Sequence, residues 1–156
     1  MQAVEVMCRK ATSDDVESLF QLIKGYAEQG IMLPRTREAL VYMIDTFVVA
    51  EIGTEVVGCG SLMKLGDNLI EIRSLGITEG YKGLGIGNKL VDGLLEQAKL
   101  QGITKVMALT YAVSFFERNG FSIVDKDIFP EKVWKDCVNC PKQHACDEIA
   151  VLRVLD

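Results

Sequence analysis

The chain has 156 residues, of which 49% are hydrophobic and 25% charged, with a formal net charge of −5. A chain of this length fits a single domain, 1–156, with a full hydrophobic core. The acidic balance argues against nucleic acid or an anionic membrane as the main partner. We find no apolar run of transmembrane length and no basic-then-apolar leader, so we expect a cytoplasmic protein.

The first half of the chain shows short apolar runs separated by capping residues and turns. In chain order, the expected elements are a strand over 4–10, a helix that ends near Gly25, a helix over 37–47, and strands over 48–52, 56–65 and from Leu69. Thr12 or Ser13 would cap the first helix and Thr36 the second, because a side-chain hydroxyl accepts from the first-turn N–H groups. Residues 26–35 are expected to be a connection.

The second half continues the alternation of strand and helix. The strand from Leu69 continues through 71–77 into a glycine loop, after which we expect a helix, a strand over 105–111, a helix over 114–119, a strand over 121–124, a cysteine-rich insert at about 130–147 and a strand over 148–155. Gly120 would end the short helix in a left-handed conformation. This order predicts an α/β (α+β) protein with a mixed, mostly antiparallel sheet of six or seven strands flanked by about four helices.

A glycine-rich loop, Tyr81–Gly87, joins the strand over 71–77 to the following helix. Unpaired N–H groups at a helix N-terminus attract anions, and glycines let an anion approach closely, so the loop predicts a phosphate-bearing ligand. It is not a Walker loop, because Gly87 is followed by Asn88 and Lys89. The spacing of its glycines also differs from that of the dinucleotide fingerprint.

The segment Lys82-Gly83-Leu84-Gly85-Ile86-Gly87 resembles the acyl-CoA pyrophosphate loop of the GNAT N-acetyltransferases, with Lys82 in place of the usual Gln or Arg. The order of elements is similar over nearly the whole chain. The resemblance implies that acetyl-CoA is bound by these six residues. It further implies contacts from the backbone of Leu75, Gly76 and Ile77 to acetyl and pantetheine. Gly76 inside a strand independently indicates a bulge or a close ligand approach.

A second segment, 115–121, also resembles this family, but Phe116 stands where the family often has a tyrosine proposed as general acid. Closer similarity is to the short bacterial N-acetylglutamate synthases, and it is carried by residues 32–36, 71–75, 109–111 and 130–137. This implies an amino-acid N-acetyltransferase that acetylates glutamate, or glutamine, at the α-amine in arginine biosynthesis. Another small amine or a protein N-terminus as acceptor, or a non-catalytic acyl-CoA sensor, remain alternatives.

Acetyl transfer to an amine needs a base, because a free amino acid is an ammonium ion at neutral pH. Glu71 is the first candidate for this base, and the alternative is that Glu71 is a solvent-facing charge at the start of a strand. Glu51 is a weaker candidate for the base. Tyr111 is the candidate general acid or hydrogen-bond donor to the CoA thiolate. The alternative is that Tyr111 only packs at a strand end. Cys59 fits a small buried residue better than a nucleophile, since direct transfer needs no acyl-enzyme.

An acceptor with two carboxylates favours arginine, which forms paired hydrogen bonds that lysine cannot reproduce. Arg73 on the strand and Arg35 at the entrance to the second helix are the candidates, and a solvated loop end is the alternative for Arg35. Ser74 and Lys64 could also line the acceptor pocket.

The insert carries Cys137, Cys140, His144 and Cys146 within ten residues. The spacing of the three cysteines allows a structural zinc, with His144 the weakest ligand, but also free thiols or a disulfide. The expected partners are acetyl-CoA and an amino acid, with no nucleic acid and no membrane. The sequence leaves a homodimer open.

Overall fold

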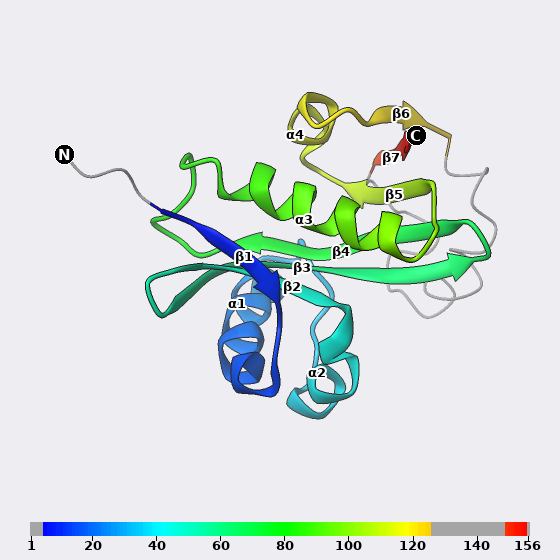
Figure 1. Cartoon of the computed structure of the whole chain (residues 1–156). Helices are drawn as coiled ribbons and strands as arrows, with labels where there is room; N and C mark the ends of the chain where they lie inside the picture. Colours follow the sequence, from blue (N-terminus) through cyan, green and yellow to red (C-terminus); the bar gives the residue numbers. More distant parts are fainter. Residues whose placement is uncertain (1–4, 126–148, 156) are drawn as a thin grey trace. The chain divides into compact units, whose positions relative to one another are not determined.

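The computed structural model describes residues 5–125 and 149–155 (Figure 1). Its helical elements are η1 (Ser13–Asp15), α1 (Val16–Glu28), α2 (Arg37–Met43), η2 (Ile44–Thr46), α3 (Ile86–Leu100) and α4 (Val113–Arg118). Its strands are β1 (Met7–Lys10), β2 (Phe47–Ile52), β3 (Glu55–Gly66), β4 (Leu69–Ile77), β5 (Lys105–Thr110), β6 (Ser122–Val124) and β7 (Ile149–Val154). The predicted order of elements is confirmed.

Within the described residues, seven strands form one sheet in the order β1-β2-β3-β4-β5-β7-β6. The β4–β5 pair is parallel, with Glu71 opposite Met107, whereas β1–β2, β2–β3, β5–β7 and β6–β7 are antiparallel. The predicted mixed, mostly antiparallel α/β sheet is therefore confirmed. None of the described helices has the length and apolar character needed to cross a lipid bilayer.

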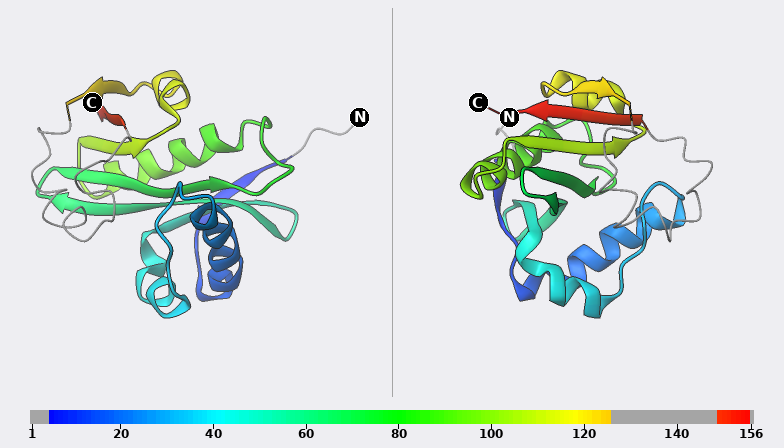
Figure 2. Two further views of the ribbon diagram at one scale, coloured as in Figure 1. Left: turned by 180° about the vertical axis from the view of Figure 1, so that it is seen from behind. Right: turned by 90° about the vertical axis from the view of Figure 1, so that its right-hand side faces the viewer.

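The chain forms two compact units, divided at residues 62/63, 71/72 and 97/98. In the first unit, α1 and α2 cover one face of the strands and α3 the other (Figures 1 and 2). The core under α1 and α2 is apolar and comprises Ala11, Leu19, Ile23, Leu40, Phe47, Val49 and Cys59. On β3, Gly58 and Gly60 let α3 approach closely, because a Cβ there would lie 2.9 Å from Leu90 Cδ1 and 2.8 Å from Leu94 Cδ1.

Two helix ends differ from the sequence prediction. Helix α1 continues through Gly25 to Glu28, and the left-handed residue lies at Gly30, with φ 75°. A helical glycine costs only about 1 kcal/mol relative to alanine, so tertiary contacts of the last turn can override it. Helix α2 ends at Met43 rather than near Phe47, because Phe47 instead begins β2 and pairs with Ser61. The Thr36 cap is confirmed, since its hydroxyl accepts from Ala39 N–H at 3.0 Å.

An ion cluster fixes the start of α1 to β1 and β2. Arg9 donates to both carboxylate oxygens of Asp15, at 2.8 and 3.0 Å, and to Glu51 at 3.2 Å. Asp15 also accepts from Thr12 N–H at 2.7 Å and is buried. The weaker base candidate Glu51 is therefore bonded to Arg9, which gives it a structural role.

Asp15→Asn is expected to lower the free energy of unfolding by about 2 kcal/mol at neutral pH, because the charged hydrogen bonds from the partly exposed Arg9 to the buried Asp15 carboxylate are lost. The Arg9 guanidinium holds the pKa of the Asp15 carboxyl below its ordinary value. This stabilisation is thus complete above the unfolded-state pKa and is lost as pH falls through the folded-state pKa. Urea unfolding should show the two proteins converging below about pH 4. Exposed Asp14→Asn is the matched control, and an equal loss there would contradict the assignment.

The second unit contains the start of β4 together with β5, β7, β6 and α4. Strand β7 lies between β5 and β6 (Figure 2). Its core is built around Leu65, Leu69, Met107 and Ala150. Gly120 has φ 87°, as predicted for a helix C-terminus, and Arg153 donates to the neighbouring Asn119 carbonyl at 2.7 Å. Arg153 thereby satisfies a carbonyl at the end of α4.

Candidate functional site

The glycine loop runs from the end of β4 into α3, as predicted. Gly83 and Gly85 adopt left-handed φ values of 84° and 77°, and a Cβ at either would meet no atom within 4 Å. Lys82 and Leu84 are exposed, whereas Ile86 is buried as the first residue of α3. The loop therefore presents open space and a cation beside a helix N-terminus, which is the arrangement that binds a phosphate group.

The turn that begins α3 is closed by a hydrogen bond from Lys89 N–H to the Gly85 carbonyl, at 3.3 Å. The N–H groups in the first turn of a helix point toward its N-terminal end, and the helix dipole adds positive potential there. Helix α3 has 15 residues, so its dipole extends over several turns.

Strand β4 is irregular at Ser74, which has φ 52°. Two side chains of β3 donate to carbonyls here: Ser61 Oγ to Arg73 O and Cys59 Sγ to Ser74 O, both at 3.2 Å. Side chains thus satisfy carbonyls that a regular ladder would pair with backbone N–H groups. The sequence indicates a bulge or a close ligand approach at Gly76, whereas the positive φ lies two residues earlier, at Ser74.

Gly76 instead accommodates a side chain of α1. A Cβ at Gly76 would lie 2.7 Å from Tyr26 Cε2 and 2.9 Å from Leu22 Cδ2. The Tyr26 hydroxyl donates to the Ile77 carbonyl at 2.9 Å and accepts from Ile77 N–H at 3.0 Å. Tyr26 was expected in a connection and is the residue that sequence reasoning missed. Its spacing from Leu19 and Ile23, i+7 and i+3, could have placed it on the same helix face.

Glu71 is 2% exposed and lies in the parallel β4–β5 pair opposite Met107. The alternative of a solvent-facing charge at a strand start is wrong, because β4 begins two residues earlier at Leu69. A carboxylate withdrawn from water is costly unless its interactions compensate, which makes Glu71 a candidate for a functional role.

Tyr111 follows the last residue of β5 and is 43% exposed. The turn beyond it is shaped by Thr110, whose hydroxyl accepts from Ala112 N–H at 2.7 Å. A tyrosine hydroxyl on an exposed turn can donate a proton or a hydrogen bond to a ligand.

Phe116 is 4% exposed and packs edge-to-face against Phe115 and Phe121, with ring centroids 5.2 and 5.1 Å apart. This residue therefore stabilises the packing of α4 against the segment leading into β6. A phenyl ring has no proton to transfer, so the role of general acid cannot lie here.

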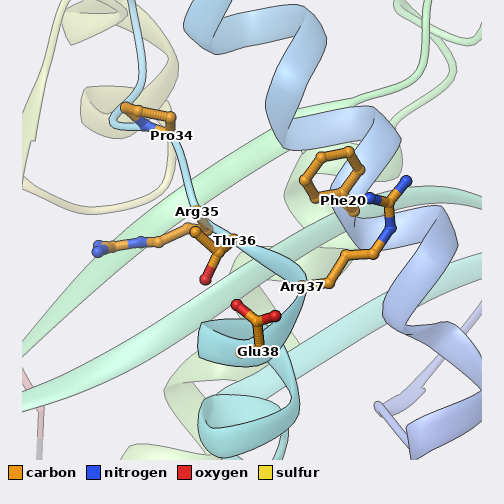
Figure 3. Close-up of a pocket in the computed structure, with 6 residues that line it drawn as sticks. All are labelled: Phe20, Pro34, Arg35, Thr36, Arg37 and Glu38. Carbon is orange, nitrogen blue, oxygen red and sulfur yellow. The ribbon is translucent and has the colours of Figure 1, made fainter.

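A pocket of about 390 Å³ opens beside α1 and the start of α2 in the first unit (Figure 3). It is lined by Phe20, Pro34, Arg35, Thr36, Arg37 and Glu38. Arg37 donates to both Glu17 oxygens, at 2.7 and 3.0 Å, and its guanidinium stacks 4.0 Å over the Phe20 ring. In Figure 3 the Arg35 side chain points away from Arg37. The two arginines of this segment therefore have different surroundings.

The predicted acceptor residues Arg35, Arg73 and Ser74 belong to the first unit, together with the glycine loop, whereas Glu71 and Tyr111 belong to the second. Arg35 Nε and Arg73 Nη2 are shielded from solvent. Shielded guanidinium nitrogens need acceptors in the protein or in a ligand.

Cys59 is fully buried, and burial raises the pKa of its thiol to about 12. It is a thiol rather than a thiolate at neutral pH, which supports the expected packing role. The described residues hold no group of three or more His, Cys, Asp or Glu arranged for a metal ion. The predicted ligands Cys137, Cys140 and Cys146 lie outside the described residues.

Comparison with known proteins identifies the family. Residues 14–121 match the acetyltransferase (GNAT) family. The match covers more than half of the chain, including β4, the glycine loop, α3 and β5. The chain therefore belongs to the GNAT acetyltransferase family, and the predicted resemblance and fold are confirmed.

Two curated relatives narrow the comparison. An uncharacterized N-acetyltransferase of Chlorobaculum tepidum is 38% identical over 155 residues, which cover 99% of this chain and 100% of the relative. The amino-acid acetyltransferase of Mycobacterium tuberculosis is 36% identical over 120 residues, which cover 75% of this chain and 68% of the relative.

Among solved structures, the N-acetylglutamate synthase of Neisseria gonorrhoeae, complexed with coenzyme A and N-acetyl-glutamate, is similar with a TM-score of 0.88 and 27% identity. The similarity covers 99% of this chain but 36% of the synthase chain. This chain is thus similar to a part of that longer protein.

Proposed function

We propose that this protein transfers the acetyl group of acetyl-CoA to the α-amine of glutamate, or of glutamine. The observation that carries the proposal is the open, left-handed glycine loop at the start of α3, in a chain similar to an amino-acid acetyltransferase and to an N-acetylglutamate synthase. In this proposal the product N-acetylglutamate would enter arginine biosynthesis.

The donor's pyrophosphate would lie in the loop formed by Lys82, Gly83, Leu84, Gly85, Ile86 and Gly87. Helix N–H groups and the Lys82 ammonium would neutralise its charge. Backbone groups of Leu75, Gly76 and Ile77 would contact the pantetheine arm and the acetyl carbonyl. The preceding irregularity at Ser74 supports this assignment, because it frees part of β4 from a regular ladder.

The acceptor's carboxylates would be bound by Arg35 and Arg73, with Ser74 as a further donor. Arg35 borders the pocket of about 390 Å³, and Arg73 lies on β4 next to Ser74. A guanidinium pairs with a carboxylate through two parallel hydrogen bonds. A small anionic acceptor therefore fits these residues better than a cationic amine.

Glu71 would take a proton from the acceptor's ammonium group, directly or through a water molecule. The free amine would then attack the thioester carbonyl carbon, and the resulting oxyanion would accept from β4 N–H groups. As this intermediate collapses, the C–S bond breaks and CoA leaves as the thiolate, while the attacking nitrogen loses its second proton, which passes to the thiolate to give CoA–SH and the neutral amide. The Tyr111 hydroxyl would donate a proton or a hydrogen bond to that thiolate.

The direct test is CoA release by the purified protein with a panel of free amino acids. Turnover is expected with glutamate or glutamine and not with a cationic aminoglycoside or with a peptide that has a free N-terminus. The absence of turnover with either amino acid at millimolar concentration would rule out the proposed acceptor.

A non-catalytic acyl-CoA sensor is the second candidate, and the buried phenyl ring of Phe116 favours it. It differs from the enzyme in one measurable property. A sensor would bind acetyl-CoA and leave it intact with every amine in the panel, so calorimetry combined with the release assay separates the two functions.

Gly85→Ala is expected to raise the Kd for CoA about tenfold, because a Cβ at φ 77° would point into the space assigned to pyrophosphate. Gly53→Ala is the matched control. Gly53 also has a left-handed φ, of 61°, and no neighbour within 4 Å of a Cβ, but it lies in the β2–β3 turn. Calorimetry should show a weaker complex only for the loop variant, and similar effects of both would remove the loop from the donor site.

A further inference from the structure

Tyr26 forms an unusual pair of hydrogen bonds with one residue of β4. Its hydroxyl has one proton, so it donates to the Ile77 carbonyl, at 2.9 Å, while accepting from Ile77 N–H, at 3.0 Å. In a sheet, the N–H and the carbonyl of one residue form hydrogen bonds to an adjacent strand, and any extended chain that carries amides could form the same two bonds. The Tyr26 hydroxyl therefore occupies the position at Ile77 where the amide of another chain could bind.

The next residue shows which edge of β4 is occupied. Thr78 N–H donates to the Val57 carbonyl of β3 at 2.8 Å. Because backbone groups of successive residues in a strand point to opposite edges, the groups of Ile77 point away from β3. The Tyr26 hydroxyl thus lies at the edge of β4 opposite β3, on one of the three residues proposed to contact the donor's pantetheine arm.

The same side chain also touches the anion-binding loop. Lys82 Nζ lies 5.5 Å from the centroid of the Tyr26 ring, within the range of a cation–π interaction. The ring packs over Gly76, because a Cβ at this position would lie only 2.7 Å from Tyr26 Cε2. A pyrophosphate that attracts Lys82 and an amide that bonds to Ile77 would therefore disturb two of the contacts that hold Tyr26.

We propose that Tyr26 holds the Ile77 amide pair in the unliganded protein and is displaced when the pantetheine arm of the acyl donor binds there. This inference rests on the proposed function. Tyr26 is half-buried, and Ile77 is half-buried as well, so the hydroxyl can leave the strand edge while α1 keeps its core residues Leu19 and Ile23 in place. Donor binding and the tyrosine contact are thus mutually exclusive.

The test is Tyr26→Phe, which removes the competing hydroxyl and keeps the ring. Isothermal calorimetry with CoA is expected to give a Kd about fivefold lower than that of the wild type, since two neutral hydrogen bonds no longer have to be broken. Tyr42→Phe is the matched control, because Tyr42 is 91% exposed on α2 and should leave the Kd unchanged. Tyrosine labelled with ¹³C at Cζ gives a second measurement, because the Tyr26 resonance should shift on saturation with CoA.

An equal or higher Kd for Tyr26→Phe would overturn the displacement, and so would a Tyr26 resonance that does not move with CoA bound. If the wild type does not bind CoA, the proposed function fails and this inference with it. CoA binding by the wild type tests the proposed function. The comparison of the Kd values of the wild type and Tyr26→Phe tests the displacement of Tyr26.

Discussion

Glu71→Gln is expected to lower kcat by about 10²- to 10⁴-fold with glutamate as acceptor, the range typical of a lost general base. The amide has nearly the shape of the carboxyl group but cannot accept a proton from an ammonium ion. Because Glu71 is buried opposite Met107, the substitution should change little in the surrounding packing. Steady-state kinetics and calorimetry with CoA would separate a loss in chemistry from a loss in donor binding.

The control for this variant is Glu96→Gln, a matched change at an exposed position of α3. A thermal unfolding curve establishes whether Glu71→Gln remains folded. A folded variant with wild-type kcat would exclude Glu71 as the base and leave a structural role for its carboxylate.

Arg73→Ala is expected to raise the KM for the acceptor about 10- to 100-fold, the effect of losing hydrogen bonds between a guanidinium and a carboxylate. The Kd for CoA should change little, because the loop assigned to pyrophosphate begins nine residues later, at Lys82. Arg73→Lys should give an intermediate KM, since it keeps the charge and loses the paired geometry.

Initial-rate measurements over a range of glutamate concentrations give this KM, and exposed Arg118→Ala is the control. Losses of equal size in acceptor KM and CoA binding would point to a distorted β4 rather than a missing carboxylate ligand. That outcome would contradict the assigned role of Arg73.

Local patterns were sufficient to predict much of the fold. The glycine loop before the apolar stripe of α3, the Thr36 cap and the left-handed Gly120 each depend on neighbours within a few residues, and all three are confirmed. The mixed sheet followed from the order of strands and helices, in which α3 connects the parallel strands β4 and β5. These features depend on periodicity and turn chemistry, which a sequence displays directly.

Features that depend on distant contacts could not be predicted. Gly25 indicated a helix end, but Tyr26 is bonded to Ile77, 51 residues away, and the helix continues. Ser74 carries no signal for a positive φ, because the Ser61 and Cys59 side chains that bond to the adjoining carbonyls lie on another strand. The predicted site residues remain predictions of role, since burial and position alone do not assign chemistry.

The Cys59 thiol is buried on β3 and donates a hydrogen bond to the Ser74 carbonyl, so its chemical reactivity can report local opening of β4. With a pKa near 12 it is almost entirely protonated at neutral pH, and alkylating reagents attack thiolates. Its alkylation rate therefore reports how often the irregular part of the sheet opens, at a single residue of the native sequence. Peptide mapping would separate this slow reaction from those of the other four cysteines, which include the half-buried Cys8.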